Sequence, residues 1–206
     1  MDVAAKLRAQ LVLSAFLIML GLGQLVAGSM SDTLGRRPVL LAGSLLFTVA
    51  GAAALISPNI ELLIVARALQ GFGASACMAV GRVIINDSFD KTEAGRQLST
   101  ITMIMAIVPM LGFAGGGLVA DIIGWRGTVG IMVITAGVIF LANMALLAET
   151  NHNRVARAPI LKVVGVFYLL LRKREFVVHA TSGALLTAAF FALGGFMPYE
   201  FHNELA

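Results

Sequence analysis

The sequence predicts an all-α, polytopic membrane protein with six transmembrane helices. Of its 206 residues, 59% are hydrophobic and 13% are charged, whereas soluble domains contain about 25% charged residues. Five stretches of 22 to 24 residues contain no Asp, Glu, Lys or Arg, and about 20 apolar residues in a helix cross a ~30 Å hydrocarbon core. None of these stretches alternates polar and apolar residues, which excludes the strands of a membrane β-barrel.

A sixth stretch of the same length carries two internal charges, Arg67 and Arg82. The first stretch is too long for the h-region of a cleaved signal peptide. Cys77 is the only cysteine, so we expect no disulfide framework and no paired metal-ligand spacing. We also expect no metal site, no cofactor and no enzymatic activity. The predicted spans are 9–31, 38–60, 62–85, 97–120, 127–148 and 176–199.

The distribution of Lys and Arg predicts the orientation in the membrane. The positive-inside rule places the side with more of these residues in the cytoplasm, so membrane topology accounts for the net charge of +4 and no nucleic-acid partner is expected. Six spans leave both termini outside, which is an awkward arrangement for Lys6 and Arg8 and predicts a missing upstream helix. Eleven of the 15 cations lie on the predicted cytoplasmic side: Arg36, Arg37, Arg82, Lys91, Arg96, Arg154, Arg157, Lys162, Arg172, Lys173 and Arg174.

An internal repeat supports this topology independently. The pattern Gly-x-x-x-Asp-x-x-Gly-x-Arg occurs at 28–37 and again at 117–126, 89 residues later. Three spans separate the copies, so the second copy is inverted in the membrane, as in secondary transporters with inverted repeats. The chain therefore looks as if it begins one span late, and 176–199 opens a repeat that is not finished.

These features divide the chain into three parts. Residues 1–150 form a bundle of five spans, and 176–206 contain the first helix of a second half. Between them, 151–175 combine six Lys or Arg with a short apolar segment, which predicts a basic amphipathic helix at the cytoplasmic surface. A loosely ordered polybasic hinge is the alternative.

The first copy of the repeat, at 28–37, is a candidate functional loop. Gly28 and Gly35 allow close backbone approach and a tight turn, and Pro38 suits the first turn of the next helix. Asp32 can accept hydrogen bonds from free N–H groups at the helix start or pair with Arg36. Alternatively, the arginines only obey the positive-inside rule. The candidate residues are Gly28, Asp32, Gly35, Arg36 and Arg37.

A second candidate site lies within the third predicted span. Arg67 and Gln70 are three residues apart and share a helix face. An arginine in a span costs about 2.5–3.5 kcal/mol and therefore faces protein or a water-filled cavity, unless it reaches the outer interface. Gly71 follows, within rows of small residues that permit close helix packing: Gly73, Cys77 and Gly81, with Gly71, Ser75 and Ala79 beside them.

The motif at 28–37 resembles the loop between the second and third helices of the major facilitator superfamily, and the segment from Arg67 to Gly73 resembles its fourth-helix motif. Asp87, the Gly-Trp-Arg sequence at 124–126 and Glu149 with Thr150 are similar to the drug:proton antiporter branch, specifically its bicyclomycin and chloramphenicol resistance group. The resemblance aligns the six spans with helices two to seven of a twelve-helix transporter. It implies that the loop at 28–37 is a gating loop, which latches the two halves on the cytoplasmic face.

The fourth span resembles the Gly-Pro-x-x-Gly-Gly helix of antiporters, with Phe113 at the position of the motif's proline. Pro109 predicts a kink one turn earlier, because proline removes a backbone donor. His179 is read as an interfacial residue rather than a proton relay. The candidate residues of this glycine-rich helix are Pro109, Gly112, Gly116 and Gly117.

The resemblance implies proton-coupled efflux of amphipathic drugs across a bacterial inner membrane, with lipid around the bundle. One alternative is a uniporter or symporter for a polar metabolite. Another is a truncated membrane fragment that does not transport. With the first helix and the C-terminal half of the parent transporter missing, we expect that the chain alone does not complete a transport cycle.

Overall fold

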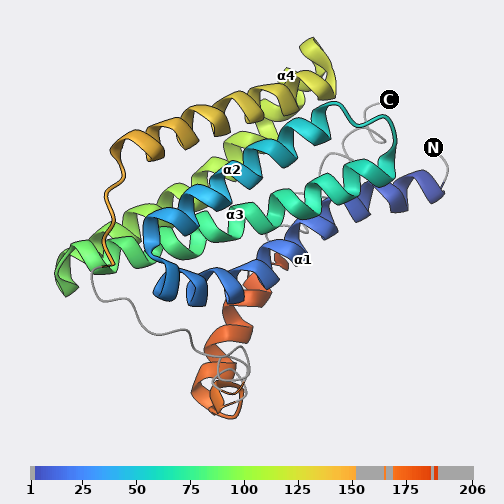
Figure 1. Ribbon diagram of the computed structural model, residues 1–206. Coiled ribbons are helices and arrows are strands. Elements are labelled where there is room, and N and C mark those ends of the chain that lie inside the picture. The colour runs from blue at the N-terminus through green and yellow to red at the C-terminus, as the bar shows by residue number, and fades with distance from the viewer. Residues whose placement is uncertain (1–2, 152–164, 166–168, 187, 190–206) are drawn as a thin grey trace.

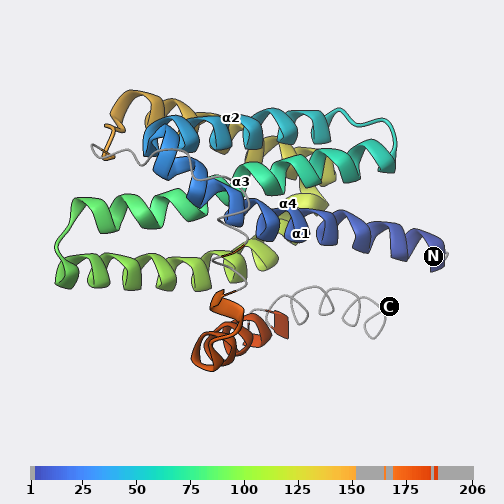
Figure 2. The same ribbon diagram turned by 60° about the horizontal axis from the view of Figure 1, so that its bottom comes forward.

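The computed structural model describes residues 3–151, 165, 169–186 and 188–189. In this part of the chain the regular structure is helical throughout (Figure 1). The elements are α1 (Val3–Leu34), α2 (Arg36–Leu55), α3 (Ile60–Ser88) and α4 (Lys91–Leu146). Residues 174–186 form a further helical segment, which lies apart from these four elements in both views (Figures 1 and 2).

Gly124 divides α4 into two helices. Its torsion angles, φ 74° and ψ 168°, are not helical, and a positive φ is readily available only to glycine. The chain reverses at this residue, so that the part after Gly124 returns alongside α2 (Figure 1). We call residues 91–123 the outgoing arm and residues 125–146 the return arm. The outgoing arm contains the predicted span 97–120, and the return arm covers residues 127–146 of the predicted span 127–148.

Four stretches of the described chain are long and apolar enough to cross a membrane: Gln10–Leu34, Arg36–Leu55, Ile60–Ser88 and Gly115–Leu146. The last of them includes the reversal at Gly124. The described residues therefore confirm an all-helical architecture with several elements long and apolar enough to cross a membrane. The number of six spans stays a prediction, as does the division into three parts, and most of the predicted amphipathic linker lies outside the described residues.

The predicted boundary between the second and third spans is wrong. The span was expected to continue to Ile60, but α2 ends at Leu55 and α3 already begins at Ile60. Pro58 disfavours helical torsion angles at the preceding Ser57. Asn59 then caps α3, because its side-chain oxygen accepts a hydrogen bond from the backbone nitrogen of Leu62 at 2.9 Å.

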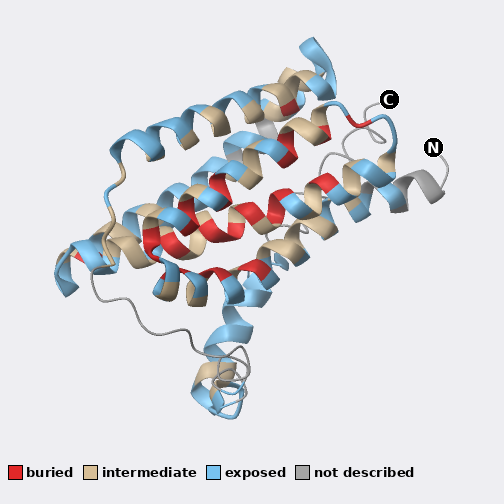
Figure 3. Cartoon of the chain, in the orientation of Figure 1, coloured by how far each residue is buried: buried red, intermediate tan, exposed pale blue. Residues whose placement is uncertain are grey.

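The core of the bundle lies along α3, which packs against both α1 and α2. Buried residues are concentrated on the facing sides of α2 and α3, whereas α4 and the segment at 174–186 are largely exposed (Figure 3). Exposed apolar side chains are expected on helices surrounded by lipid. The main hydrophobic cluster consists of small and medium side chains: Ala27, Val39, Leu40, Ala76 and Val80.

Two of the predicted small residues allow helix backbones to approach closely. A Cβ added to Gly71 would overlap the backbone carbonyl of Phe16 in α1, and one added to Gly73 would lie 2.6 Å from the backbone nitrogen of Phe47 in α2. At Gly81 an added Cβ would meet nothing within 4 Å. Close packing through the small-residue rows is therefore confirmed at Gly71 and Gly73, whereas at Gly81 no other helix of the described residues approaches closely.

Candidate functional site

Arg36 is the centre of a charged cluster where α1 meets α2. It is the first residue of α2 and is only 8% exposed. Its Nη1 donates to Oδ1 of Asp32 at 2.5 Å and to Oγ of Ser31 at 2.9 Å, while its Nε donates to Oδ2 of Asp87 at 3.0 Å. The expected pairing of Asp32 with Arg36 is confirmed. Asp87 adds a second carboxylate from the end of α3, so one buried guanidinium connects three helices.

Glu149 supplies the hydrogen-bond acceptors at the start of α2. Its Oε1 accepts from the backbone nitrogen of Arg36 at 2.8 Å and its Oε2 from that of Arg37 at 3.3 Å. Gly35, the N-cap residue, has no side chain to provide this cap. The carboxylate that binds these N–H groups is therefore Glu149, while Asp32 binds the guanidinium.

Sequence reasoning did not give Glu149 this role, although it noted the residue in a family motif. The available signal is an isolated acid directly after a long apolar span. Asn151 completes the arrangement: its backbone nitrogen donates to Oε1 of Glu149 at 2.9 Å, and its Nδ2 donates to the backbone oxygens of Ser31 at 3.3 Å and Asp32 at 3.1 Å.

The two glycines of the gating loop behave differently. Gly35 has φ 108°, and an added Cβ would overlap the carboxylate of Glu149. The expectation of a tight turn that needs glycine is therefore confirmed at Gly35. Gly28 lies in a regular part of α1, and a Cβ there would meet nothing within 4 Å. Among the described residues no backbone approaches Gly28 closely, so the close approach expected there stays a prediction.

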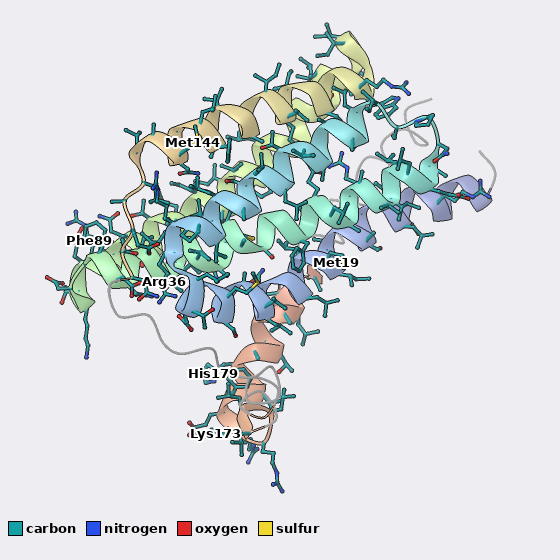
Figure 4. All side chains as sticks on the ribbon, in the orientation of Figure 1. Met19, Arg36, Phe89, Met144, Lys173 and His179 are labelled. Atoms are coloured by element: carbon teal, nitrogen blue, oxygen red, sulfur yellow. The ribbon has the colours of Figure 1, made fainter. Side chains whose placement is uncertain are left out.

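The side chain of Arg37 contacts α4, whereas that of Arg36 contacts α1 and α3. Its Nη2 donates to the backbone oxygen of Met144, in the last turn of α4, at 2.9 Å. Figure 4 labels Met144 on the return arm and Arg36 at the junction of α1 and α2. The junction thus binds α1, α2, the end of α3 and the end of α4 together through charged groups. Such contacts must break if any of these elements moves away.

The second candidate site is separate from this junction. Nη1 of Arg67 donates to Oε1 of Gln70 at 3.1 Å, and Gln70 is fully buried. The arginine side chain therefore turns toward its helix neighbour within the bundle, and its buried Nε has no hydrogen-bond partner in the part of the chain that the structure describes. Nε2 of Gln70 lies 3.9 Å from Sδ of Met132 on the return arm. The adjacent Gly71 forms the close contact with α1 described above.

Comparison with known proteins places this architecture in a family. The family model described as Major Facilitator Superfamily matches residues 3–205, nearly the whole chain. The chain belongs to the Major Facilitator Superfamily. It is accordingly a multi-pass membrane protein of a transporter family.

Individual members of the superfamily are about one-third identical to this chain. An uncharacterized MFS-type transporter, YdgK of Bacillus subtilis, is 32% identical over 94% of the chain and 49% of the relative. A chloramphenicol resistance protein of Pseudomonas aeruginosa is 36% identical over 71% of the chain and 35% of the relative. Multidrug resistance protein MdtM of Salmonella typhimurium is 31% identical over 79% of the chain and 39% of the relative. The chain spans half or less of the length of these relatives.

The glycine-rich segment of this superfamily member lies apart from both polar sites. Pro109 is in the outgoing arm, but the non-helical torsion angles inside α4 occur at Gly124. A Cβ added at Gly112, Gly116 or Gly117 would meet nothing within 4 Å. Among the described residues, these glycines make no close contact with the gating loop or with Arg67.

Proposed function

We propose that the chain is part of a proton-coupled exporter of amphipathic drugs in a bacterial inner membrane. The observation that carries this proposal is its similarity to superfamily members named for multidrug and chloramphenicol resistance. The predominantly apolar helices support the same substrate class, since they offer few polar groups to a sugar or an amino acid.

In this proposal the charged junction is the gate on the cytoplasmic face. Arg36 is buried between Asp32 and Asp87, which come from different helices. Separation of α1, α2 and α3 would leave the arginine or a carboxylate without its partner, and an unpaired charge with little access to water is costly. The junction therefore stabilises one conformation of the transporter, and rearrangement of its contacts accompanies the change to another.

The pair formed by Arg67 and Gln70 is the proposed polar site within the membrane, with Gly71 packed on α1. Because the Nε of Arg67 has no partner among the described residues, the guanidinium retains capacity to bind an acceptor group. The segment with Pro109, Gly112, Gly116 and Gly117 presents small residues on which another helix can pack closely.

Drug resistance and transport assays test the proposal. The complete gene product is expressed in a bacterium that lacks its main efflux pumps, and resistance to chloramphenicol and several cationic dyes is measured. Inside-out vesicles then report whether adding a drug dissipates the proton gradient. We expect drug-dependent proton release that is lost in Arg36→Ala and retained in Arg82→Ala, whose side chain is exposed. Uptake of a sugar or amino acid without any drug transport would instead support a metabolite carrier.

A further inference from the structure

The two copies of the sequence repeat adopt the same backbone conformation. Gly35 and Gly124 occupy equivalent repeat positions, and they are the two residues of the described chain with positive φ, 108° and 74°. Each glycine separates one helix from the next. In each copy the repeat arginine follows two residues later, as Arg37 at the start of α2 and Arg126 at the start of the return arm.

Both arginines reach a backbone oxygen at the far end of the other helix. Arg37 donates from Nη2 to Met144 at 2.9 Å, and Arg126 donates from Nη2 to Ser57 at 3.5 Å. Met144 lies in the last turn of α4, and Ser57 lies two residues beyond the end of α2. The four groups thus form two reciprocal contacts, one at each end of an antiparallel helix pair.

The repeat offset of 89 residues also relates the two acceptors. Under this offset Met144 corresponds to Leu55, the last residue of α2, and Ser57 corresponds to Leu146, the last residue of α4. The acceptors are therefore equivalent to within two residues. Met144 has one of the last carbonyls of its helix, which have no partner within the helix and attract basic side chains. The carbonyl of Ser57 lies just beyond the end of α2, at the negative end of the helix dipole.

Between the two arginine contacts, α2 and the return arm pack against each other along their length. A Cβ added to Gly51 of α2 would lie 3.0 Å from Cγ2 of Val133, and one added to Gly137 of the return arm would lie 3.9 Å from Cγ2 of Thr48. These contacts follow the same antiparallel register as the two arginine contacts. The pair is therefore held in the middle by small residues and at its ends by cations.

We propose that Arg37 and Arg126 are equivalent positioning residues that clamp α2 to the return arm at opposite membrane surfaces. The clamps keep these two helices as one rigid unit. This role does not depend on which substrate the protein carries, because it concerns one helix pair only. The clamp role assigns a function to Arg126 and to the second copy of the repeat. This function is separate from that of the charged junction around Arg36.

The two clamps are supported in different ways. At the first, Glu149 accepts a hydrogen bond from the backbone nitrogen of Arg37. At the second, the guanidinium of Arg126 lies 4.4 Å from the ring centroid of Trp125, which occupies the repeat position of Arg36. This cation–π contact holds the arginine over the ring. With its 3.5 Å hydrogen bond, the second clamp is the weaker of the two.

Distances between spin labels test the two clamps separately. In a Cys77→Ser background, one label pair is placed at Ala42 and Ala145, near Arg37, and the other at Ile56 and Ile131, near Arg126. All four labelled positions are exposed, and the 89-residue offset converts one pair into the other. The matched pairs therefore report the separation of the same two helices at their two ends. The purified chain is measured in lipid nanodiscs.

We expect Arg37→Gln to lengthen and broaden only the first distance and Arg126→Gln only the second. The variants Arg37→Lys and Arg126→Lys, which keep a cation, give smaller changes, and Arg82→Gln changes neither distance. Trp125 is the only tryptophan in the sequence, so its fluorescence is a second readout. Arg126→Gln uncovers one face of the ring and increases quenching by acrylamide, whereas Arg37→Gln does not.

An unchanged second distance in Arg126→Gln overturns the proposal, because Arg126 is then only an interfacial residue. Equal loosening of both ends by either substitution also contradicts it, since that result indicates general destabilisation of the bundle. If a glutamine variant does not insert, a methionine variant at the same position, which also removes the cation, is measured with the same label pairs and decides between these outcomes.

Discussion

The backbone nitrogen of Arg36 donates a hydrogen bond to Oε1 of Glu149 at 2.8 Å, although 113 positions separate the two residues in the chain. The N-cap position of α2 is occupied by Gly35, which has no side chain to accept from the helix start. A carboxylate from beyond α4 performs this task and also brings a negative charge to the positive end of the helix dipole. The beginning of α2 and the end of α4 are thereby fixed to each other.

Removal of this cap destabilises the bundle. We expect Glu149→Ala to lower the free energy of unfolding by about 1–2 kcal/mol, the range of a lost charged N-cap. Glu149→Gln keeps one acceptor oxygen and loses less. Thermal unfolding of the purified protein in detergent measures both. Glu61→Ala is the matched control, because Glu61 is exposed in the first turn of α3, where Asn59 already caps the helix. Equal losses for Glu149→Ala and Glu61→Ala would contradict the capping role.

The two carboxylates around Arg36 differ in their exposure to solvent. The Asp87 side chain is 31% exposed and that of Asp32 is 52% exposed. We therefore expect Asp87→Asn to cost about 1–3 kcal/mol, between the values for exposed and buried ion pairs, and Asp32→Asn to cost less. Chemical unfolding in detergent at constant salt concentration checks this order.

The control for these substitutions is Asp121→Asn. Asp121 is the repeat equivalent of Asp32, but Trp125 stands where Arg36 would be, and within the described residues Asp121 makes no ion pair. Its substitution is expected to change stability by less than about 0.5 kcal/mol. The double variant Asp32→Asn with Asp87→Asn is expected to cost more than the two single losses together, because each single variant leaves Arg36 one carboxylate and the double variant leaves its buried guanidinium none. Strict additivity argues against a shared site.

Sequence reasoning succeeded for the parts of the site that are close along the chain. Asp32 and Arg36 are four residues apart on the two sides of the turn at Gly35, so their pairing is local in the sequence, and Gly35 is recognisable as a turn residue. Glu149 and Asp87 meet Arg36 only through tertiary packing, which no local spacing predicts. The same limit applies to the helix ends: the run of uncharged residues continues through Pro58, so hydrophobicity alone did not show that α2 stops at Leu55.

Close packing of α1 on α3 depends on Gly71. A Cβ at this position would overlap the backbone of Phe16, and a backbone cannot move aside as a side chain can. We expect Gly71→Ala to destabilise the protein by about 1–3 kcal/mol through overpacking. Gly81→Ala, in the same helix but with open space around it, should be neutral or stabilising by up to about 1 kcal/mol through helix propensity. Similar melting temperatures for the two variants would refute the assigned helix contact.

Gly51 leaves the space that the side chain of Gln70 occupies. A Cβ added there would lie 2.8 Å from Nε2 of Gln70 and 3.0 Å from Cγ2 of Val133, so Gly51→Ala must displace the amide that holds Arg67. We expect a loss of about 1–3 kcal/mol in stability and, in the transport assay of the complete gene product, weaker drug efflux. Gly130→Ala is the control, because an added Cβ there meets nothing within 4 Å.

A double variant separates displacement of Gln70 from general crowding at Gly51. In a Gln70→Ala chain the amide is absent, so adding Gly51→Ala should cost clearly less stability than it does in the unmodified chain. The remaining cost reports the contact with Val133, which is unchanged by the truncation of Gln70. If Gly51→Ala costs the same in both backgrounds, then the amide of Gln70 is not the group that needs this glycine, and the position of Arg67 does not depend on it.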